Sequence, residues 1–203
     1  MKKLVVALLL FGLPSSIWAQ KIGVLAFEDA ANAGPELGEQ VAKFIRSELL
    51  KNKKYIPKFI QYKAEEGEST SIDFEKAVEL GKKNGVDYVV IGTILEAEVT
   101  KGSAGVGNVT ILGQSVGSSL RTVTATLTIQ GDLISVETGK LVESYRATGS
   151  KTDRSVGADV STEWGSVTAG GEGGGEGGAK TPNAQALREA VEDLVKQLSK
   201  AIK

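Results

Sequence analysis

Residues 86–94 read Val-Asp-Tyr-Val-Val-Ile-Gly-Thr-Ile, and the predicted architecture is built around them. Their apolar side chains follow one another almost without interruption, which is typical of a strand buried on both faces of a sheet. Just before them, Asn84 and Gly85 end a helical pattern, with glycine at the position that usually terminates a helix. A helix leading directly into a doubly buried strand predicts an α/β sheet with residues 86–94 at its centre.

Two further strands are predicted upstream. Residues 22–27 form a short, nearly continuous apolar run, as a strand buried on both faces would. Residues 55–62 form a second run that contains Pro57. Because proline cannot donate to a hydrogen-bond ladder, it is confined to sheet edges. We therefore expect residues 55–62 at an edge of the sheet.

Two helices are predicted between these strands. Gly34 and Pro35 precede the first helix, and proline suits the first helical turn. Thr70 and Asp73 have the spacing of a capping box before the second helix. The apolar side of this second helix is expected to consist of Phe74, Ala77, Val78 and Gly81.

Downstream of the central strand, the pattern becomes that of a β-hairpin followed by a helix. Residues 121–133 alternate between apolar side chains and threonines, the period of a strand with one buried face. Residues 137–140 read Glu-Thr-Gly-Lys and predict a tight turn into a return strand. Thr181 and Pro182 then begin the clearest helix of the chain. Its apolar stripe consists of Leu187, Ala190, Val191, Leu194, Val195, Leu198 and Ile202.

Two glycine-rich segments interrupt this pattern. Residues 102–119 are rich in glycine, serine and short apolar side chains, and residues 170–178 read Gly-Gly-Glu-Gly-Gly-Gly-Glu-Gly-Gly. We interpret both as loops or hairpin regions within one domain that spans residues 20–203. The predicted fold is an α/β fold with a mixed β-sheet flanked by helices, and the C-terminal amphipathic helix is packed on the sheet.

The start of the chain predicts export. Lys2 and Lys3 are positive, residues 4–13 are apolar, and Ala19 is the small residue that signal peptidase needs. The apolar run is roughly 10 residues, whereas a membrane-spanning helix needs about 20. Residues 1–19 are therefore interpreted as a signal peptide rather than a retained membrane anchor. Because the sequence has no cysteine, we expect no lipid anchor of the bacterial lipoprotein type.

The composition lacks two of the side-chain types that enzymes use most often in catalysis. The sequence has no histidine and no cysteine, which removes the commonest general base and all thiol chemistry. Its 24 basic and 25 acidic residues give a net charge of −1, so nothing indicates a nucleic-acid partner. Glu28 and Asp29 at the end of a predicted strand could ligate a cation or act in acid–base chemistry, but no third ligand or partner base is identifiable, and we interpret them as solvated loop charges. Asp132, beside the predicted hairpin turn, is interpreted in the same way. We predict no enzyme and no catalytic, cofactor-binding or metal-binding residue.

Three phrases of the sequence, in this order, resemble the curli production assembly/transport family CsgG and its wider envelope relatives. They are residues 22–29, residues 77–81 together with 85–94, and residues 126–142. The glycine-rich tract 170–178 and the terminal helix resemble the end of the same family. The likeness spans nearly all of the expected mature chain.

The resemblance implies a periplasmic α/β domain. In channel-forming members of the family, subunits assemble into a ring, and each adds two β-hairpins to an outer-membrane barrel. Here the first hairpin would lie within residues 105–129, with 109–116 as the partner of 121–129. The second would lie within residues 149–180, but its return limb lacks the apolar side chains that a lipid-facing strand needs.

Three functions remain open. The first is a non-enzymatic periplasmic module without a cofactor that acts in assembly or secretion of surface components. Its expected partners are other envelope proteins and copies of itself, in a homo-oligomer. It is also expected to associate with the outer membrane. The second is a subunit of an oligomeric outer-membrane secretion channel. They differ in whether residues 102–121 and 149–180 are loops or membrane hairpins. The third is a periplasmic small-molecule-binding protein, which requires a pocket with convergent polar groups.

Overall fold

The computed structural model describes residues 19–34, 36–62, 72–105, 109–111, 114–116, 119–156, 164 and 181–202. Residues 1–18 of the predicted signal peptide and the glycine-rich tract 170–178 lie outside the described residues.

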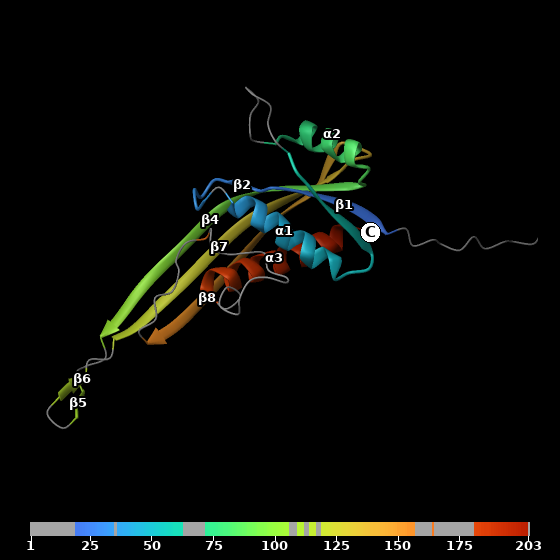
Figure 1. Cartoon of the computed structure of the whole chain (residues 1–203). Helices are drawn as coiled ribbons and strands as arrows, with labels where there is room; N and C mark the ends of the chain where they lie inside the picture. The colour runs from blue at the N-terminus through green and yellow to red at the C-terminus, as the bar shows by residue number, and fades with distance from the viewer. Residues whose placement is uncertain are drawn as a thin grey trace, which may run out of the picture.

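The described chain forms a large mixed sheet, a small hairpin and three helices (Figure 1). The large sheet contains β1 (Gln20–Leu25), β2 (Glu28–Asp29), β3 (Tyr55–Ile60), β4 (Tyr88–Gly105), β7 (Ser119–Ser135) and β8 (Lys140–Val156). The small hairpin consists of β5 (Val109–Ile111) and β6 (Gln114–Val116). The helices are α1 (Leu37–Leu50), α2 (Phe74–Asn84) and α3 (Pro182–Ala201).

The strand order β3-β1-β4-β7-β8 explains the layering of the helices. Strands β3, β1 and β4 are parallel, whereas β7 and β8 join them as antiparallel neighbours. The chain crosses from β1 to β3 in one direction and from β3 back to β4 in the other. Since such crossovers are right-handed, α1 and α2 must cover opposite faces. The predicted mixed α/β fold is confirmed, and Pro57 lies in the edge strand β3 as expected.

The residues that cap the helices agree with the sequence predictions except at the start of α2. Gly85 ends α2 in the left-handed conformation, at φ 65°, as predicted. At the start of α2 the prediction was wrong: the N-cap is Asp73, whose carboxylate accepts from the Lys76 N–H at 2.8 Å, and not Thr70. A carboxylate at the N-cap satisfies a free backbone donor of the first helical turn directly. Thr70, the other residue of the predicted capping box, lies outside the described residues. Thr181 caps α3 in the same way through the Ala184 N–H, at 3.3 Å.

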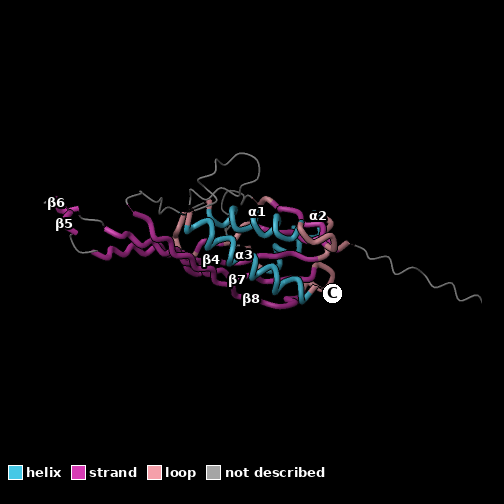
Figure 2. The backbone as a smooth tube through the Cα atoms, turned by 90° about the horizontal axis from the view of Figure 1, so that it is seen from below, coloured by secondary structure: helices cyan, strands magenta, loops and turns pink. Residues whose placement is uncertain are grey.

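The core has two parts, one on each face of the sheet. Helices α1 and α3 lie together on the first face (Figure 2), and α2 packs on the second face, at one end of it (Figure 1). The predicted apolar stripe of α3 is buried throughout, at Leu187, Ala190, Val191, Leu194, Val195, Leu198 and Ile202. Helix α3 approaches β8 closely at Gly149, where a Cβ atom would lie 2.0 Å from the carbonyl oxygen of Ala186. The predicted docking of the C-terminal helix on the sheet is therefore confirmed.

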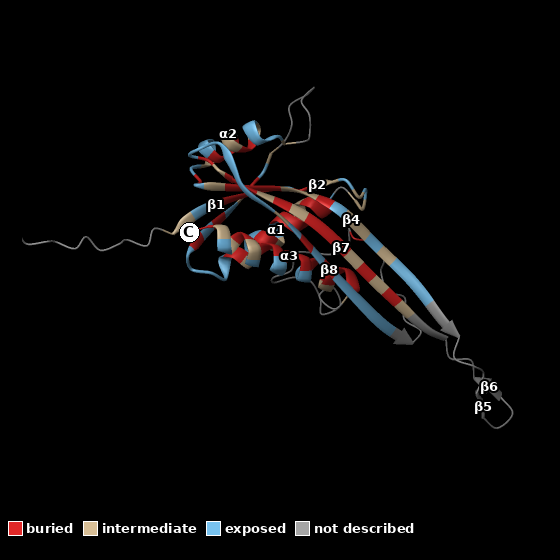
Figure 3. Cartoon of the chain, turned by 180° about the vertical axis from the view of Figure 1, so that it is seen from behind, coloured by how far each residue is buried: buried red, intermediate tan, exposed pale blue. Residues whose placement is uncertain are grey.

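Strand β4 runs well past the predicted end at Ile94. A bulge at Leu95 shifts the register, so the alternation of buried and open side chains inverts there. Because the alternation of apolar and polar residues changes phase at Leu95, the sequence pattern does not indicate that the strand continues beyond Ile94. Residues 96–105, 119–128 and 148–156 form a three-stranded ribbon, which we call the arm. The arm extends beyond α3, and much of its β4 and β8 strands is exposed (Figure 3).

The pairing within the arm corrects a further prediction. Residues 121–129 pair with 94–103 of β4, and not with 109–116, whose two short strands pair with each other. The long β4 supplies the partner because its ladder with β7 continues without a break from Glu96 to Gly105.

Among the described residues, no helix is long and apolar enough to cross a membrane.

Candidate functional site

A pocket of about 770 Å³ opens on the face of the sheet that α2 only partly covers. This volume is within the range of about 300–1,000 Å³ that is usual for ligand sites. Its lining consists of Ala26, Phe27, Glu28, Asp29, Tyr62, Ile72, Asp73, Phe74, Ile91, Gly92, Thr93 and Asp132.

The topology explains why the pocket lies here. In open α/β sheets, ligands bind beyond the carboxyl ends of the parallel strands. Ala26 and Phe27 directly follow β1, and Tyr62 follows β3 by two residues. Ile72 and Asp73 directly precede α2, so the first turn of that helix forms the opposite wall. Ile91 and Asp132 are paired across β4 and β7 and supply the floor.

Phe27 is held in place by two glycines. Its N–H donates to the carbonyl oxygen of Gly38 at 3.1 Å, and a Cβ atom at Gly38 would lie 1.9 Å from the Phe27 carbonyl oxygen. Its ring crosses β4 at Gly92, where a Cβ atom would lie 2.3 Å from the ring carbon Cε1. Only residues without a side chain permit this path, and it leaves Phe27 only 4% exposed beside the pocket.

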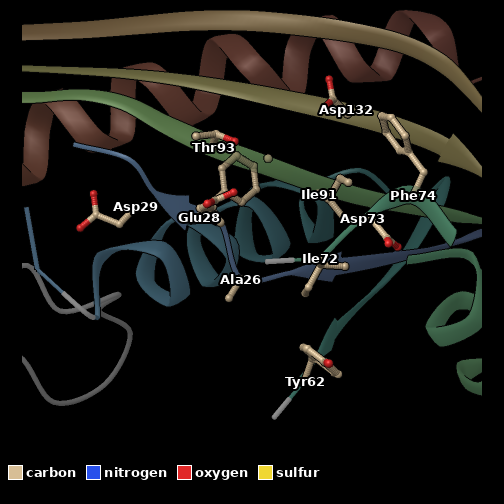
Figure 4. A pocket seen from close by; sticks show the side chains of 12 residues that line it. Ala26, Glu28, Asp29, Tyr62, Ile72, Asp73, Phe74, Ile91, Thr93 and Asp132 are labelled. Carbon is tan, nitrogen blue, oxygen red and sulfur yellow. The ribbon is translucent and has the colours of Figure 1, made fainter. Parts of the chain in front are cut away.

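The charged residues that line the pocket are all acidic. Asp73 accepts from Lys76 N–H, Asp132 accepts from the Ser144 hydroxyl, and Asp29 accepts from the Gly34 N–H at 2.9 Å. Figure 4 places Asp132, Phe74 and Asp73 on one side of the pocket, Glu28 and Thr93 facing them, and Asp29 farther away. The described residues of the lining include four carboxylates and no lysine or arginine, so this part of the pocket carries a negative potential.

The structure brings together residues that the sequence analysis treated separately. Glu28, Asp29 and Asp132, interpreted as solvated loop charges, line one pocket although Asp132 is more than 100 residues from Glu28. Phe74, expected on the buried side of α2, is 45% exposed and lines the same pocket. The contribution of Tyr62 was not predicted, and its only signal was its position just after an apolar strand. Among the described residues, no three acidic side chains are grouped so that they could hold a metal ion.

The face of the arm that continues from the pocket is lined with hydroxyls. Three cross-strand pairs connect β7 to β8: Thr124 with Thr152 at 2.9 Å, Thr126 with Ser150 at 3.2 Å, and Thr128 with Thr148 at 3.1 Å. Thr128 also donates to Glu96 at 2.9 Å. Such pairs stabilise a ribbon that has no helix over this face.

The arm has two outer strand edges, one on β4 and one on β8, and α3 contacts part of the β8 edge. On β8, the Ser150 N–H donates to Glu189 of α3 at 3.3 Å, and the Arg146 carbonyl accepts from Gln197 of α3 at 3.2 Å. Because backbone groups alternate in direction along a strand, those of Thr152 and Arg154 also point away from β7. No described strand pairs with this edge, nor with β4 beyond Ile94. Within the described part of the chain, β4 beyond Ile94 and β8 beyond Ser150 are therefore open strand edges.

The surroundings of Tyr145 on β8 alter the titration of its phenol. Partial burial and a hydrogen bond of its phenol to Glu143, at 2.6 Å, raise the pKa of Tyr145 from 10.0 to about 12. Tyr145 lies on β8 outside the pocket, so this shift reflects local structure rather than chemistry at the site.

Comparisons with solved structures find similar chains at low sequence identity. The hypothetical protein CT253 from Chlamydia trachomatis is 14% identical, with a TM-score of 0.52, over 90% of this chain and 96% of that one. The PelC dodecamer from Paraburkholderia phytofirmans is 12% identical, with a TM-score of 0.47, over 90% and 88%. The LpoB C-terminal domain from Escherichia coli is 15% identical, with a TM-score of 0.40, over 68% and 87%.

A search of curated proteins finds no match. A comparison with protein families matches residues 13–203 to the family described as curli production assembly/transport component CsgG. This match covers nearly the whole chain, in agreement with the resemblance of its three sequence phrases. The chain therefore belongs to the CsgG family.

Proposed function

We propose that the protein is a non-enzymatic component of the bacterial cell envelope that acts in the assembly or secretion of surface components through protein–protein contacts. The observation that carries this proposal is the family match over residues 13–203, because the family is described as an assembly and transport component. The absence of histidine and cysteine from the sequence favours a binding role over catalysis.

The open edges of the arm support self-association as one of these contacts. An exposed strand edge offers unpaired N–H and C=O groups to another strand. The free edge of β4 carries Glu96 and Glu98, whereas β8 carries Arg146 and Arg154 on the same face of the sheet. When the sheet continues from β8 of one copy to β4 of the next, one of these arginines can lie opposite one of the glutamates; the two arginines are eight residues apart and the two glutamates only two, so one register pairs a single arginine. We infer that the protein forms a homo-oligomer through the arm.

The side-chain pattern of the arm favours a water-exposed role over insertion into lipid. Lys101, Val123 and Asp153 lie directly opposite one another on the three strands, so they share the face that carries α3. Lys101 and Asp153 are exposed. A lipid-facing row requires apolar side chains, and charges there cost about 2–4 kcal/mol each at the membrane midplane. The proposal is therefore a periplasmic module rather than a channel subunit.

The proposed location is the periplasm, in association with the outer membrane. It rests on the predicted signal peptide of residues 1–19 and on the family. Fractionation of cells that express the full chain tests it. We expect the protein in the osmotic-shock fluid, or in an outer-membrane pellet from which salt releases it, as an assembly whose size on a sizing column is independent of detergent. Recovery only from the outer-membrane pellet, as a ring that requires detergent, would contradict the proposal and favour a secretion channel.

A further inference from the structure

The pocket beside α2 is not explained by self-association through the arm, because none of its lining residues belongs to the arm. It combines an apolar, aromatic part with an acidic rim. Phe74 leaves 45% of its surface exposed at the first position of α2, where a polar residue would serve the helix equally well. An exposed aromatic side chain inside a pocket indicates a surface that a ligand covers.

We propose that this pocket binds a basic side chain, an arginine or a lysine, with an apolar residue next to it, on a segment of a partner protein. Glu28, Asp73 and Asp132 come from three different elements and surround the aromatic part (Figure 4). Aromatic faces attract cations, and carboxylates pair with them. The proposal takes from the proposed function only the premise that the partner is a protein.

An arginine or lysine side chain fits this pocket better than an anionic ligand or a metal ion does. An anionic ligand would meet four carboxylates and no lysine or arginine among the lining residues. A metal ion needs carboxylates that converge, and no such group exists among the described residues. Lys76 lies near one margin, 5.6 Å from the centre of the Tyr62 ring, but its ammonium is paired with Glu79 at 3.3 Å. Because the Tyr62 ring already faces the Lys76 ammonium, the proposal assigns the partner's cation to the carboxylates and to Phe74.

The size and surroundings of the pocket favour a peptide over a small amine. A volume of about 770 Å³ accommodates more than one side chain. Thr93 and Asp132 lie on the strands β4 and β7, which continue from the pocket into the hydroxyl-lined face of the arm. Ile72 and Phe74 provide the apolar contact for the neighbouring residue.

The test uses three blocked peptides, Ala-Arg-Leu-Ala, Ala-Glu-Leu-Ala and Ala-Arg-Ala-Ala, added to ¹⁵N-labelled protein expressed from the full chain. We expect the first to shift the amide resonances of Phe27, Gly92 and Asp132, and to bind at least about tenfold more tightly than the other two. Equal binding of the arginine and glutamate peptides, or shifts confined to other residues, or no shifts, would overturn the proposal. So would equal binding of the two arginine peptides, because the apolar contact would then contribute nothing.

Charge-neutral variants make the test specific. Asp73→Asn together with Asp132→Asn keeps the hydrogen bonds to Lys76 and Ser144, since asparagine caps helices as well as aspartate does. We expect this double variant to weaken binding of the Arg-Leu peptide at least about tenfold. The matched control, Glu137→Gln with Glu143→Gln, changes the net charge equally outside the pocket and should bind as the wild type does. Unchanged binding by the pocket variant would overturn the proposal.

The same peptide titration separates this inference from the proposed function. Thr152→Pro alters the edge of the arm and leaves every lining residue in place. We expect it to bind the Arg-Leu peptide as the wild type does, whatever its state of assembly. Loss of peptide binding in this variant would contradict a binding site confined to the pocket.

Discussion

The ring of Phe27 lies directly against the bare α-carbon of Gly92. A Cβ atom at position 92 would lie 2.3 Å from Cε1 of that ring and 2.2 Å from the carbonyl oxygen of Gln130. Phe27 lies between β1 and β2, which pair with the same edge of β4, and its ring can lie over β4 only where β4 has no side chain. This single contact joins the core under α1 to the pocket on the opposite side of the sheet.

Gly92→Ala tests this contact. The added methyl group has no free space, and overpacking of this kind costs about 1–3 kcal/mol of unfolding free energy. Urea denaturation measures the loss. The control is Gly102→Ala, whose Cβ atom meets nothing closer than 3.8 Å and should change stability by less than about 0.5 kcal/mol. Equal stability of the two variants would contradict the packing described here.

Gly149→Ala tests the docking of α3 on β8. The new Cβ atom would lie 2.0 Å from Ala186 O and 2.6 Å from Ala190 N, so the helix backbone itself has to move. We expect a loss of about 3 kcal/mol, the upper end for overpacking. Gly131→Ala meets only the end of the Leu194 side chain, at 3.0 Å, and should cost less because that side chain can rotate. The reverse order in thermal denaturation would show that α3 is not held by this close approach.

Asp73 is expected to stabilise α2 as its N-cap. Asp73→Ala removes the acceptor for the Lys76 N–H and should lower the unfolding free energy by about 1 kcal/mol. Asp73→Asn keeps an acceptor at the same place and should cost only a few tenths of that amount. Chemical denaturation of both variants measures the difference. If both lose stability equally, the charge matters rather than the cap.

The raised pKa of Tyr145 predicts that the protein loses stability at high pH. Because folding raises the pKa of Tyr145 from 10.0 to about 12, its contribution to stability is fully present below pH 10 and is lost as the pH rises through 12. The ¹³Cζ resonance of this tyrosine, assigned with Tyr145→Phe, should titrate with a midpoint near 12. Glu143→Gln removes the charged acceptor and should lower that midpoint without restoring 10.0, since burial also contributes. A midpoint of 10.0 in the wild type would refute this assignment.

Much of the fold could be predicted because its signals are local. The apolar run 86–94, the turn at 137–140 and the stripe of α3 each lie within one element, and each is confirmed. The long continuation of β4 was missed because the bulge at Leu95 inverts the alternation where the side chains become polar. Its pairing with residues 121–129 was also missed, because the sequence offered the nearer segment 109–116 as a partner.

The pocket could not be predicted from the sequence because its residues converge only in three dimensions. Glu28, Asp73 and Asp132 lie in separate segments, and no spacing relates them. The exposure of Phe74 was also hidden, since its position in the helical period is that of a core residue. Its side chain remains open because α2 covers the sheet from Ala77 onward and leaves the first turn at the pocket.

The central claim is that the protein works through contacts made at the strand edges of the arm. Sedimentation velocity of the wild type, Thr152→Pro and Thr152→Ala tests it most directly. The backbone N–H of residue 152 points away from β7, so proline removes an edge donor while alanine keeps it. We predict that the wild type and Thr152→Ala sediment as oligomers and that Thr152→Pro sediments as a folded monomer. A wild-type monomer, or an oligomer that Thr152→Pro leaves unchanged, would contradict the account.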